Sequence, residues 1–218
     1  MADRRHVMIL HGGGLRSLVA TALVLNQADA ARVTLLHIDD GRDAAAQRAE
    51  YVRRQADHYA LRRLDELSRP HLYGATTAQQ PDGLPRATLA EAQLMLTAMA
   101  HAIDAGADEL LWPIAVDGDT AATAAAQERQ IVCTQLAEAE FMDDPSKTLP
   151  EVTLPLLGYR DAAVVELGSG LGVPWELAWS CAVNGETQCG GCPACRRRRA
   201  AFRAAGVVDP VFAPVGVR

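Results

Sequence analysis

The chain has 218 residues, 49% of them hydrophobic and only 5% aromatic, and its formal charge at pH 7 is −6. This length supports one sizeable hydrophobic core, or one core with a small appended lobe. The negative charge gives no reason to expect direct binding of nucleic acid. No apolar run is long enough to span a membrane, and the N-terminus lacks the long apolar region of a signal peptide. We therefore expect a cytoplasmic protein whose cysteines stay reduced.

Strand and helix patterns alternate in the first part of the chain. Short apolar runs predict strands, and stretches rich in Ala, Leu or Arg predict helices. In chain order we predict a strand at His6–Leu10, a helix at Leu18–Gln27, a strand at Val33–Ile38, a helix at Ala44–Ala56 and a weaker strand at Tyr59–Leu64. The stretch Ser68–Arg86 is rich in Pro and polar residues, and it is either a mobile active-site flap or a surface excursion.

The same alternation continues in the second part. We predict a helix at Leu89–Ala105 ended by Gly106, a strand at Glu109–Ile114, a helix at Ala121–Glu140 capped by Asp119 or Thr120, a linker at Asp143–Pro150, a strand at Val152–Leu157 and a helix at Arg160–Leu167 ended by Gly168. A lone helical cysteine, Cys133, is expected to be a small buried side chain. Alternating strands and helices imply parallel pairing, so we predict an α/β fold with helices on both faces. Functional residues are then expected at the carboxyl ends of the strands.

The loop after the first strand reads HGGGLRS, from His11 to Ser17. Its position between a strand and a helix is one where backbone N–H groups and the helix dipole converge on an anion. The loop matches neither G-x-x-x-x-G-K-[ST], because it has no Lys, nor G-x-G-x-x-G. Glycines at this position are also common in a plain tight turn. Phosphate binding and a structural turn therefore both remain open at this point.

Four cysteines near the C-terminus have metal-ligand spacing: Cys181, Cys189, Cys192 and Cys195. Two residues between cysteines allow both sulfurs to face one ion, and four thiolates favour a closed, structural Zn²⁺ site. The alternatives are an iron–sulfur cluster or a pair of disulfides. Arg196–Arg199 and Arg203 form a local basic cluster, which we interpret as the solvated start of a helix rather than a phosphate site.

The C-terminal residues resemble a known family. WELAWSCAVNGETQCGGCPACRRRRAAF, at Trp175–Phe202 and preceded by LGVP, closely resembles the C-terminal signature of the 7-cyano-7-deazaguanine synthases. Fainter similarity extends over most of the chain, including the first strand and loop, Asp39 and Gly41, GADELL and LPLLGYRDAAVVELG. These enzymes are zinc-bearing members of the N-type ATP pyrophosphatase group, also called the PP-loop superfamily.

The resemblance implies both a fold and a function. The implied fold is a Rossmann-like (adenine nucleotide alpha-hydrolase-like) parallel sheet at residues 1–170, with a four-Cys zinc lobe at 171–218 packed on it. The implied reaction is ATP-dependent conversion of 7-carboxy-7-deazaguanine and ammonia to the nitrile, a step towards queuosine, with ATP and Mg²⁺ as cofactors and a homodimer as the assembly. The nucleotide-binding residues implied are Gly12, Gly13, Gly14, Leu15, Arg16, Ser17 and Asp39.

Several positions depart from the family pattern. The family loop S-G-G-x-D-S matches Gly12–Ser17, so a serine is replaced by Gly12 and an aspartate by Arg16. No carboxylate is found at Thr120–Ala126, where the family reads S-G-Y-P-D-C-R. The family's R-N pair is matched only by Arg86-Ala87, and its lysine near L-L-x-L-T-K is replaced around Arg160 and Asp161. The substitution at Arg16 either impairs the site or lets a guanidinium take over part of the phosphate neutralisation.

Three functional hypotheses follow. The first is an ATP-using synthase, with the family substrate or a related deazapurine. The second is a catalytically impaired paralogue that binds a nucleotide. The third is a structural subunit whose zinc lobe docks a protein partner.

Overall fold

The computed structural model describes residues 5–27, 32–42, 44–70, 72, 89–144 and 146–213. Within them, parallel strands form one sheet in the order β3-β2-β1-β4-β5. The strands are β1 (His6–Leu10), β2 (Arg32–Asp39), β3 (Arg63–Ser68), β4 (Glu109–Leu111) and β5 (Glu151–Thr153). The helices are α1 (Leu15–Leu25), α2 (Ala45–His58), α4 (Ala90–Asp104), α5 (Thr120–Phe141), α6 (Asp161–Gly170), the short 3₁₀ helix η1 (Trp175–Leu177) and α7 (Pro193–Ala204). The predicted α/β class with a parallel sheet is confirmed.

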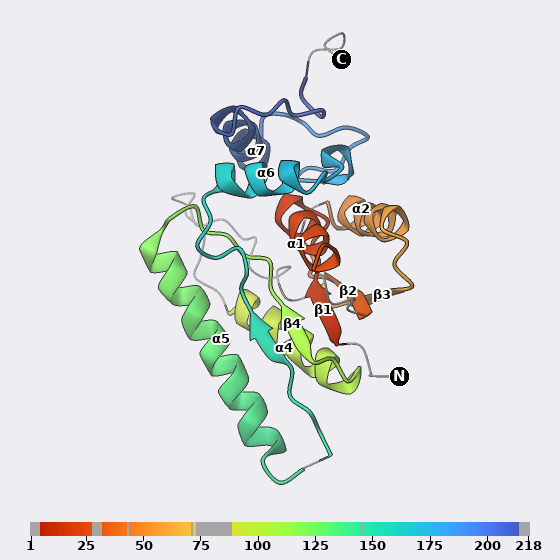
Figure 1. The fold of residues 1–218 in the computed structure, drawn as a ribbon, viewed down its shortest axis with the longest axis vertical. Coiled ribbons are helices and arrows are strands. Elements are labelled where there is room, and N and C mark those ends of the chain that lie inside the picture. The colour runs from red at the N-terminus through yellow and green to blue at the C-terminus, as the bar shows by residue number, and fades with distance from the viewer. Residues whose placement is uncertain are drawn as a thin grey trace.

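Helices cover both faces of the sheet (Figure 1). Successive residues of the central strand point to opposite faces, as expected for a strand buried on both sides. Val7 and Ile9 pack in a cluster with residues of α1, α2, α6 and α7, whereas Met8 and Leu10 pack in a second cluster with α4 and α5. Cys133 is buried in the second cluster, as predicted.

Three predicted strands differ from the structure by more than one residue in their bounds. β5 covers Glu151–Thr153 instead of Val152–Leu157, because Pro155 has no N–H group to continue the ladder. β3 begins at Arg63 instead of Tyr59, because α2 runs to His58 and the chain then turns through Ala60, whose φ is 50°. β4 ends at Leu111 instead of Ile114. Pro113, which has no N–H group, follows soon after and cannot continue the ladder.

Helix ends are partly as predicted. Asp119 caps α5, since its side chain accepts a hydrogen bond of 2.9 Å from the N–H group of Ala122. Gly106 follows α4 with a φ of 62°, the left-handed geometry typical of a helix end. α1, however, begins at Leu15 instead of Leu18, because Gly14 already serves as its N-cap. Arg16 and Ser17 therefore lie in its first turn.

The prediction that Gly168 ends a helix is wrong, because α6 continues to Gly170. A Cβ atom at Gly168 would lie 2.3 Å from the ring of Trp175 and 2.7 Å from the side chain of Val19. Gly168 thus allows α1, α6 and η1 to approach closely. Its role is in packing rather than in helix termination.

Replacing Gly168 with alanine should lower the free energy of unfolding by about 1–3 kcal/mol, because the added methyl group overpacks this contact. Gly170 is a matched control in the same helix, with no atom within 4 Å of a Cβ built on it. Gly170→Ala should leave stability unchanged or raise it by up to about 1 kcal/mol. Urea denaturation of both variants checks this, and equal stabilities would refute the packing role.

The C-terminal segment packs directly on the sheet-covering helices, and α7 lies against α6 (Figure 1). Val173, Trp175 and Phe202 belong to the same hydrophobic cluster as Val19 and Val164. The division into residues 1–170 and 171–218 therefore stays a prediction. Among the described residues, no helix is both long and apolar enough to cross a membrane.

Candidate functional site

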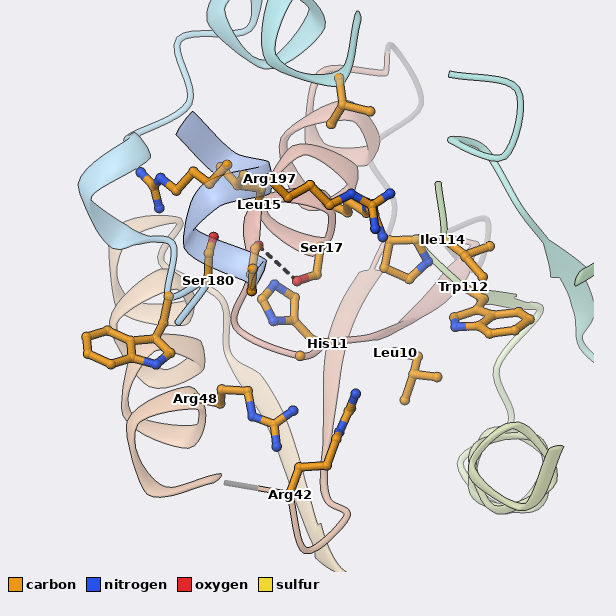
Figure 2. Close-up of a pocket in the computed structure, with 18 of the residues that line it drawn as sticks. Leu10, His11, Leu15, Ser17, Arg42, Arg48, Trp112, Ile114, Ser180 and Arg197 are labelled. Atoms are coloured by element: carbon orange, nitrogen blue, oxygen red, sulfur yellow. Dashed lines mark hydrogen bonds between the residues drawn. The ribbon is translucent and has the colours of Figure 1, made fainter. Parts of the chain in front are cut away.

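A pocket of about 450 Å³ opens at the carboxyl end of the sheet. Its wall comes from the ends of β1 and β2, the chain after β4, and residues of α1, α2, α4, α6 and α7. In Figure 2, His11 lies near the centre, with Arg42 and Arg48 on one side of it and Arg197 on the other. Trp112 and Ile114 face the same space from the side opposite Ser180 (Figure 2). The site thus has an apolar side and several cationic groups.

The glycine loop forms the turn between β1 and α1. Gly13 has a φ of 74°, and a Cβ atom there would lie 2.7 Å from the carbonyl oxygen of Arg48. The carbonyl of Gly13 accepts hydrogen bonds from the N–H group of Trp179 (2.9 Å) and from Nε2 of Gln55 (3.1 Å). Gly12 and Gly14 line the pocket, whereas Gly13 holds the loop against α2 and the C-terminal segment.

α1 presents an uncapped N-terminus to the pocket. Its N-cap, Gly14, has no side chain to satisfy the first N–H groups, and the first helical hydrogen bond runs from Leu18 to Gly14 over 3.1 Å. Leu15, Arg16 and Ser17 all line the pocket. An exposed helix N-terminus with this geometry favours an anion.

Two arginines from different elements share one carboxylate at this edge of the pocket. Arg16 Nη2 lies 2.8 Å from Asp161 Oδ1, and Arg197 Nε donates to the other oxygen. Burial by itself would raise the pKa of Asp161, but hydrogen bonds from Arg16 and Arg197 lower it below its ordinary value. All three residues line the pocket. Because the cluster has two guanidinium groups and one carboxylate, it carries an excess of one positive charge.

A second charged group lies at the end of β2. The carboxylate of Asp40 is buried and accepts hydrogen bonds from Arg42 and from Arg48, the latter over 3.2 Å. Burial would raise the pKa of Asp40, but the hydrogen bonds and charge of Arg42 and the charge of Arg48 lower it. Asp39 does not line the pocket, and its carboxylate accepts from the N–H group of Gly41 over 3.1 Å.

Two buried histidines, His11 and His37, lie beside the glycine loop. His37 Nδ1 lies 2.9 Å from the carbonyl oxygen of His11, and the N–H group of Gly13 donates to His11 Nδ1 over 3.2 Å. Burial, reinforced by neighbouring His37, lowers the pKa of His11 to about 3. Burial is also the main cause of the lowered pKa of His37. Both rings are therefore neutral at physiological pH.

The four cysteines Cys181, Cys189, Cys192 and Cys195 come together as a group that could hold a metal ion, with all four sulfur atoms within 4.8 Å of one another. The Sγ atoms of Cys181 and Cys192 are 3.9 Å apart, and those of Cys189 and Cys195 are 4.0 Å apart. None of the four forms a disulfide. Backbone N–H groups donate to the sulfurs of Cys181, Cys189 and Cys192 over 3.3–3.4 Å, which stabilises thiolates.

A short segment joins this cysteine group to the glycine loop. Gln188, next to Cys189, donates to the carbonyl of Ala178 and accepts from the N–H group of Ser180. Trp179, between them, donates to Gly13. The cysteine group and the pocket are therefore linked through hydrogen bonds of this segment.

The chain is similar to an enzyme family along almost its whole length. A 7-cyano-7-deazaguanine synthase from Methanothermobacter thermautotrophicus is 30% identical to it over 223 aligned residues, covering 94% of this chain and 97% of that protein. This chain belongs to the 7-cyano-7-deazaguanine synthase family. The family model described as "Queuosine biosynthesis protein QueC" matches residues 127–206. The resemblance inferred from the sequence is confirmed.

A short part of the chain shows higher local identity to other members of the family. A 7-cyano-7-deazaguanine synthase from Thermosynechococcus vestitus is 48% identical over 61 residues, which are 28% of this chain and 26% of that protein. Among solved structures, the U34-tRNA thiolase NcsA from Methanococcus maripaludis, determined with its 4Fe–4S cluster, matches with a TM-score of 0.53 at 12% identity, covering 99% of this chain and 79% of that one. This likeness shows the fold, and the predicted Rossmann-like class is confirmed.

The structure brings together most of the residues predicted for the nucleotide. Gly12, Gly14, Leu15, Arg16 and Ser17 line the pocket, whereas Gly13 and Asp39 are not among its lining residues. The prediction for the Ser68–Arg86 loop, and the match of Arg86-Ala87 to the family's R-N pair, fall largely outside the described residues. Their place in the site therefore stays a prediction.

Sequence reasoning assigned no role to several polar lining residues, among them His11, His37, Asp40, Arg42 and Arg48. His11 directly follows β1, and Asp40 directly follows β2, so the expectation of function at strand ends could have singled them out. Arg48 and Arg197 come from helices that reach the site only through tertiary packing. No local sequence signal marks Arg48, whereas Arg197 belongs to the basic cluster Arg196–Arg199, which we interpreted as solvated rather than as a phosphate site.

The interpretation of the basic cluster as solvated is wrong for Arg198. Its guanidinium is buried, binds both oxygens of Asp209 over 2.7 and 2.8 Å, and donates to the carbonyls of Ala178 and Trp175. A buried carboxylate partner and two carbonyls replace the solvent that such a group otherwise needs.

Proposed function

We propose that this protein binds ATP in the pocket and uses it to activate the carboxylate of 7-carboxy-7-deazaguanine, or a related deazapurine, for amidation and nitrile formation in queuosine-type biosynthesis. The observation that carries the proposal is the uncapped start of α1, which faces a pocket of about 450 Å³ in a member of the 7-cyano-7-deazaguanine synthase family. A pocket of this size suits a small-molecule ligand.

The proposed chemistry has two activation steps. First, a substrate carboxylate oxygen attacks the α-phosphorus of ATP, pyrophosphate leaves, and ammonia displaces AMP from the acyl carbon to give the amide. Second, the amide oxygen attacks another ATP, pyrophosphate leaves, and loss of AMP with the amide protons gives the nitrile. Each step releases a highly charged leaving group, which needs hydrogen-bond donors and positive charge around it.

In this chain, the donors at the loop are the N–H groups of α1, and the positive charge comes from Arg16 and Arg197. Asp161 holds both guanidinium groups at the pocket wall. Bound phosphates would compete with Asp161 for the N–H donors of Arg16 and Arg197. The carboxylates of Asp40 and Asp161 are each engaged by two arginines. We therefore propose that phosphate binding here does not depend on Mg²⁺.

We further propose that the four cysteines hold one structural zinc ion. Around a tetrahedral ion with Zn–S bonds of about 2.3 Å, neighbouring sulfurs lie roughly 3.8 Å apart, close to the 3.9 and 4.0 Å separations between paired sulfurs. In a 4Fe–4S cluster each cysteine binds a different iron, and in a 2Fe–2S cluster two cysteines bind each iron, so the four sulfurs do not all lie this close together. Four thiolate ligands leave no open position, so zinc would stabilise the C-terminal segment rather than take part in the reaction.

Metal analysis of the purified, chelator-washed protein should find close to one zinc per chain. Replacing Cys192 with serine should abolish this zinc and expose the C-terminal segment to protease, because metal binding stabilises the fold of such segments. Cys133→Ser is the control outside the group, and it should keep the zinc. Unchanged zinc content and protease resistance in the Cys192 variant would rule out the assignment.

The test of the proposed reaction is turnover. Incubation with ATP, 7-carboxy-7-deazaguanine and ammonium should yield AMP, pyrophosphate and the nitrile, detected by mass spectrometry. ATP binding without product would favour the second candidate, a catalytically impaired paralogue that binds a nucleotide. This candidate is supported by Arg16, which replaces the family's aspartate and pairs with Asp161. Cytoplasmic location, expected from the sequence, and a homodimer, implied by the family resemblance, both stay predictions.

A further inference from the structure

His37 offers the pocket an unused hydrogen-bonding atom. The side chain is only 3% exposed and lines the pocket, yet its Nε2 has no hydrogen-bond partner among the described residues. A buried polar atom without a partner costs free energy, so such atoms are rare unless a ligand or water occupies the site. His11 Nε2 and Gln55 Oε1 also lack partners, but they interact electrostatically with each other.

The hydrogen-bonding role of this atom follows from its neighbours. Because a carbonyl can only accept, the contact with His11 places a proton on His37 Nδ1. The ring is neutral, so Nε2 carries a lone pair and accepts. The charged groups that face His37 are Arg48 from α2, Asp40 directly after β2 and Glu66 from β3. Arg48 Nε is a buried donor that likewise has no hydrogen-bond partner within the described part of the chain.

We propose that His37 Nε2 and Arg48 Nε form hydrogen bonds to one edge of a ligand, where an N–H donor lies next to an acceptor. His37 Nε2 accepts from the N–H group, and Arg48 Nε donates to the acceptor. Such an edge occurs on amino-heterocycles and on lactams. The proposal rests on the proposed function, under which the edge belongs either to the adenine of ATP or to the deazapurine. His37 is then a specificity-determining residue beyond the glycine loop, and it touches the base of one ligand rather than any phosphate.

Two substitutions of His37 separate recognition from support of the loop. Asn places its amide nitrogen where His37 Nδ1 lies, so His37→Asn keeps a donor for the carbonyl of His11 and removes the acceptor. Gln reaches the position of Nε2, so His37→Gln keeps an acceptor there and removes the bond to the loop. Isothermal titration of each variant, once with ATP alone and once with 7-carboxy-7-deazaguanine alone, gives the comparison.

His37→Asn should weaken one of the two ligands by about tenfold and leave the other within about twofold, while His37→Gln weakens the affected ligand less. The affected ligand identifies the source of the edge. Loss of less than about fivefold for both ligands, or an equal loss for both, would overturn the proposal.

Failure of the proposed function is distinguishable from this result. If the wild-type protein binds neither ligand, the proposed function fails, and a crystal structure of the wild-type protein then decides the role of His37. Solvent or a bound solute at Nε2 supports a recognition role. A protein donor within hydrogen-bond distance of Nε2 overturns it.

Discussion

Replacing Arg198 with alanine should lower the free energy of unfolding by about 3–5 kcal/mol. The guanidinium is fully buried, and its loss leaves the carboxylate of Asp209 as an uncompensated buried charge. It also leaves the carbonyls of Trp175 and Ala178 without these donors. Trp179, which follows directly, binds Gly13, so the variant should weaken nucleotide binding as well. Chemical denaturation of the metal-loaded protein measures the first effect.

Arg203 provides the matched control, because it lies on the same helix and is exposed. Arg203→Ala should change stability by no more than about 0.5 kcal/mol. A loss of under about 1 kcal/mol for Arg198→Ala would mean that water or another cation replaces the guanidinium, and that the C-terminal segment is not held to the loop through this residue.

Replacing Arg16 with alanine should weaken ATP binding about 10- to 100-fold, the effect of losing a hydrogen bond between charged groups. Arg16 lies in the first turn of α1, beside the N–H groups proposed to bind the phosphates. Its side chain lines the pocket, so the guanidinium can leave Asp161 for a phosphate without refolding of the loop. Titration with ATP in the presence of a chelator measures the change.

Asp161→Asn gives a test of opposite sign. Removing the carboxylate frees Arg16 and Arg197 and takes a negative charge from the pocket wall, so ATP should bind a few-fold more tightly. Arg160→Ala is the neighbouring control, because Arg160 does not line the pocket. If the Asn variant binds ATP as weakly as Arg16→Ala, Asp161 is needed in the liganded site and the competition between Asp161 and phosphate is refuted.

The general arrangement of this protein could be predicted from its sequence because local patterns determine it. Apolar runs such as HVMIL mark buried strands, and a strand that is apolar on both faces implies helices on both sides. The cysteine group could be found for the same reason, since four ligands within a short segment report their common site directly. The glycine loop was located by its position after the first strand.

The rest depends on contacts between distant residues. Nothing in the sequence around Gly168 indicates that Trp175 packs against it, and a glycine near a helix end is otherwise a stop signal. The side chain of Arg198 is indistinguishable from its exposed neighbours until Asp209 and two carbonyls are placed around it. The partner of Arg16 likewise becomes visible only when α6 is set beside α1.

The most direct test of the central claim is isothermal titration of the zinc-loaded wild-type protein with ATP, with and without Mg²⁺. The claim is that this pocket binds a nucleotide and that Arg16 and Arg197 supply the positive charge for its phosphates. It predicts micromolar binding that persists when Mg²⁺ is removed. No binding at millimolar ATP, or binding only in the presence of Mg²⁺, would contradict it.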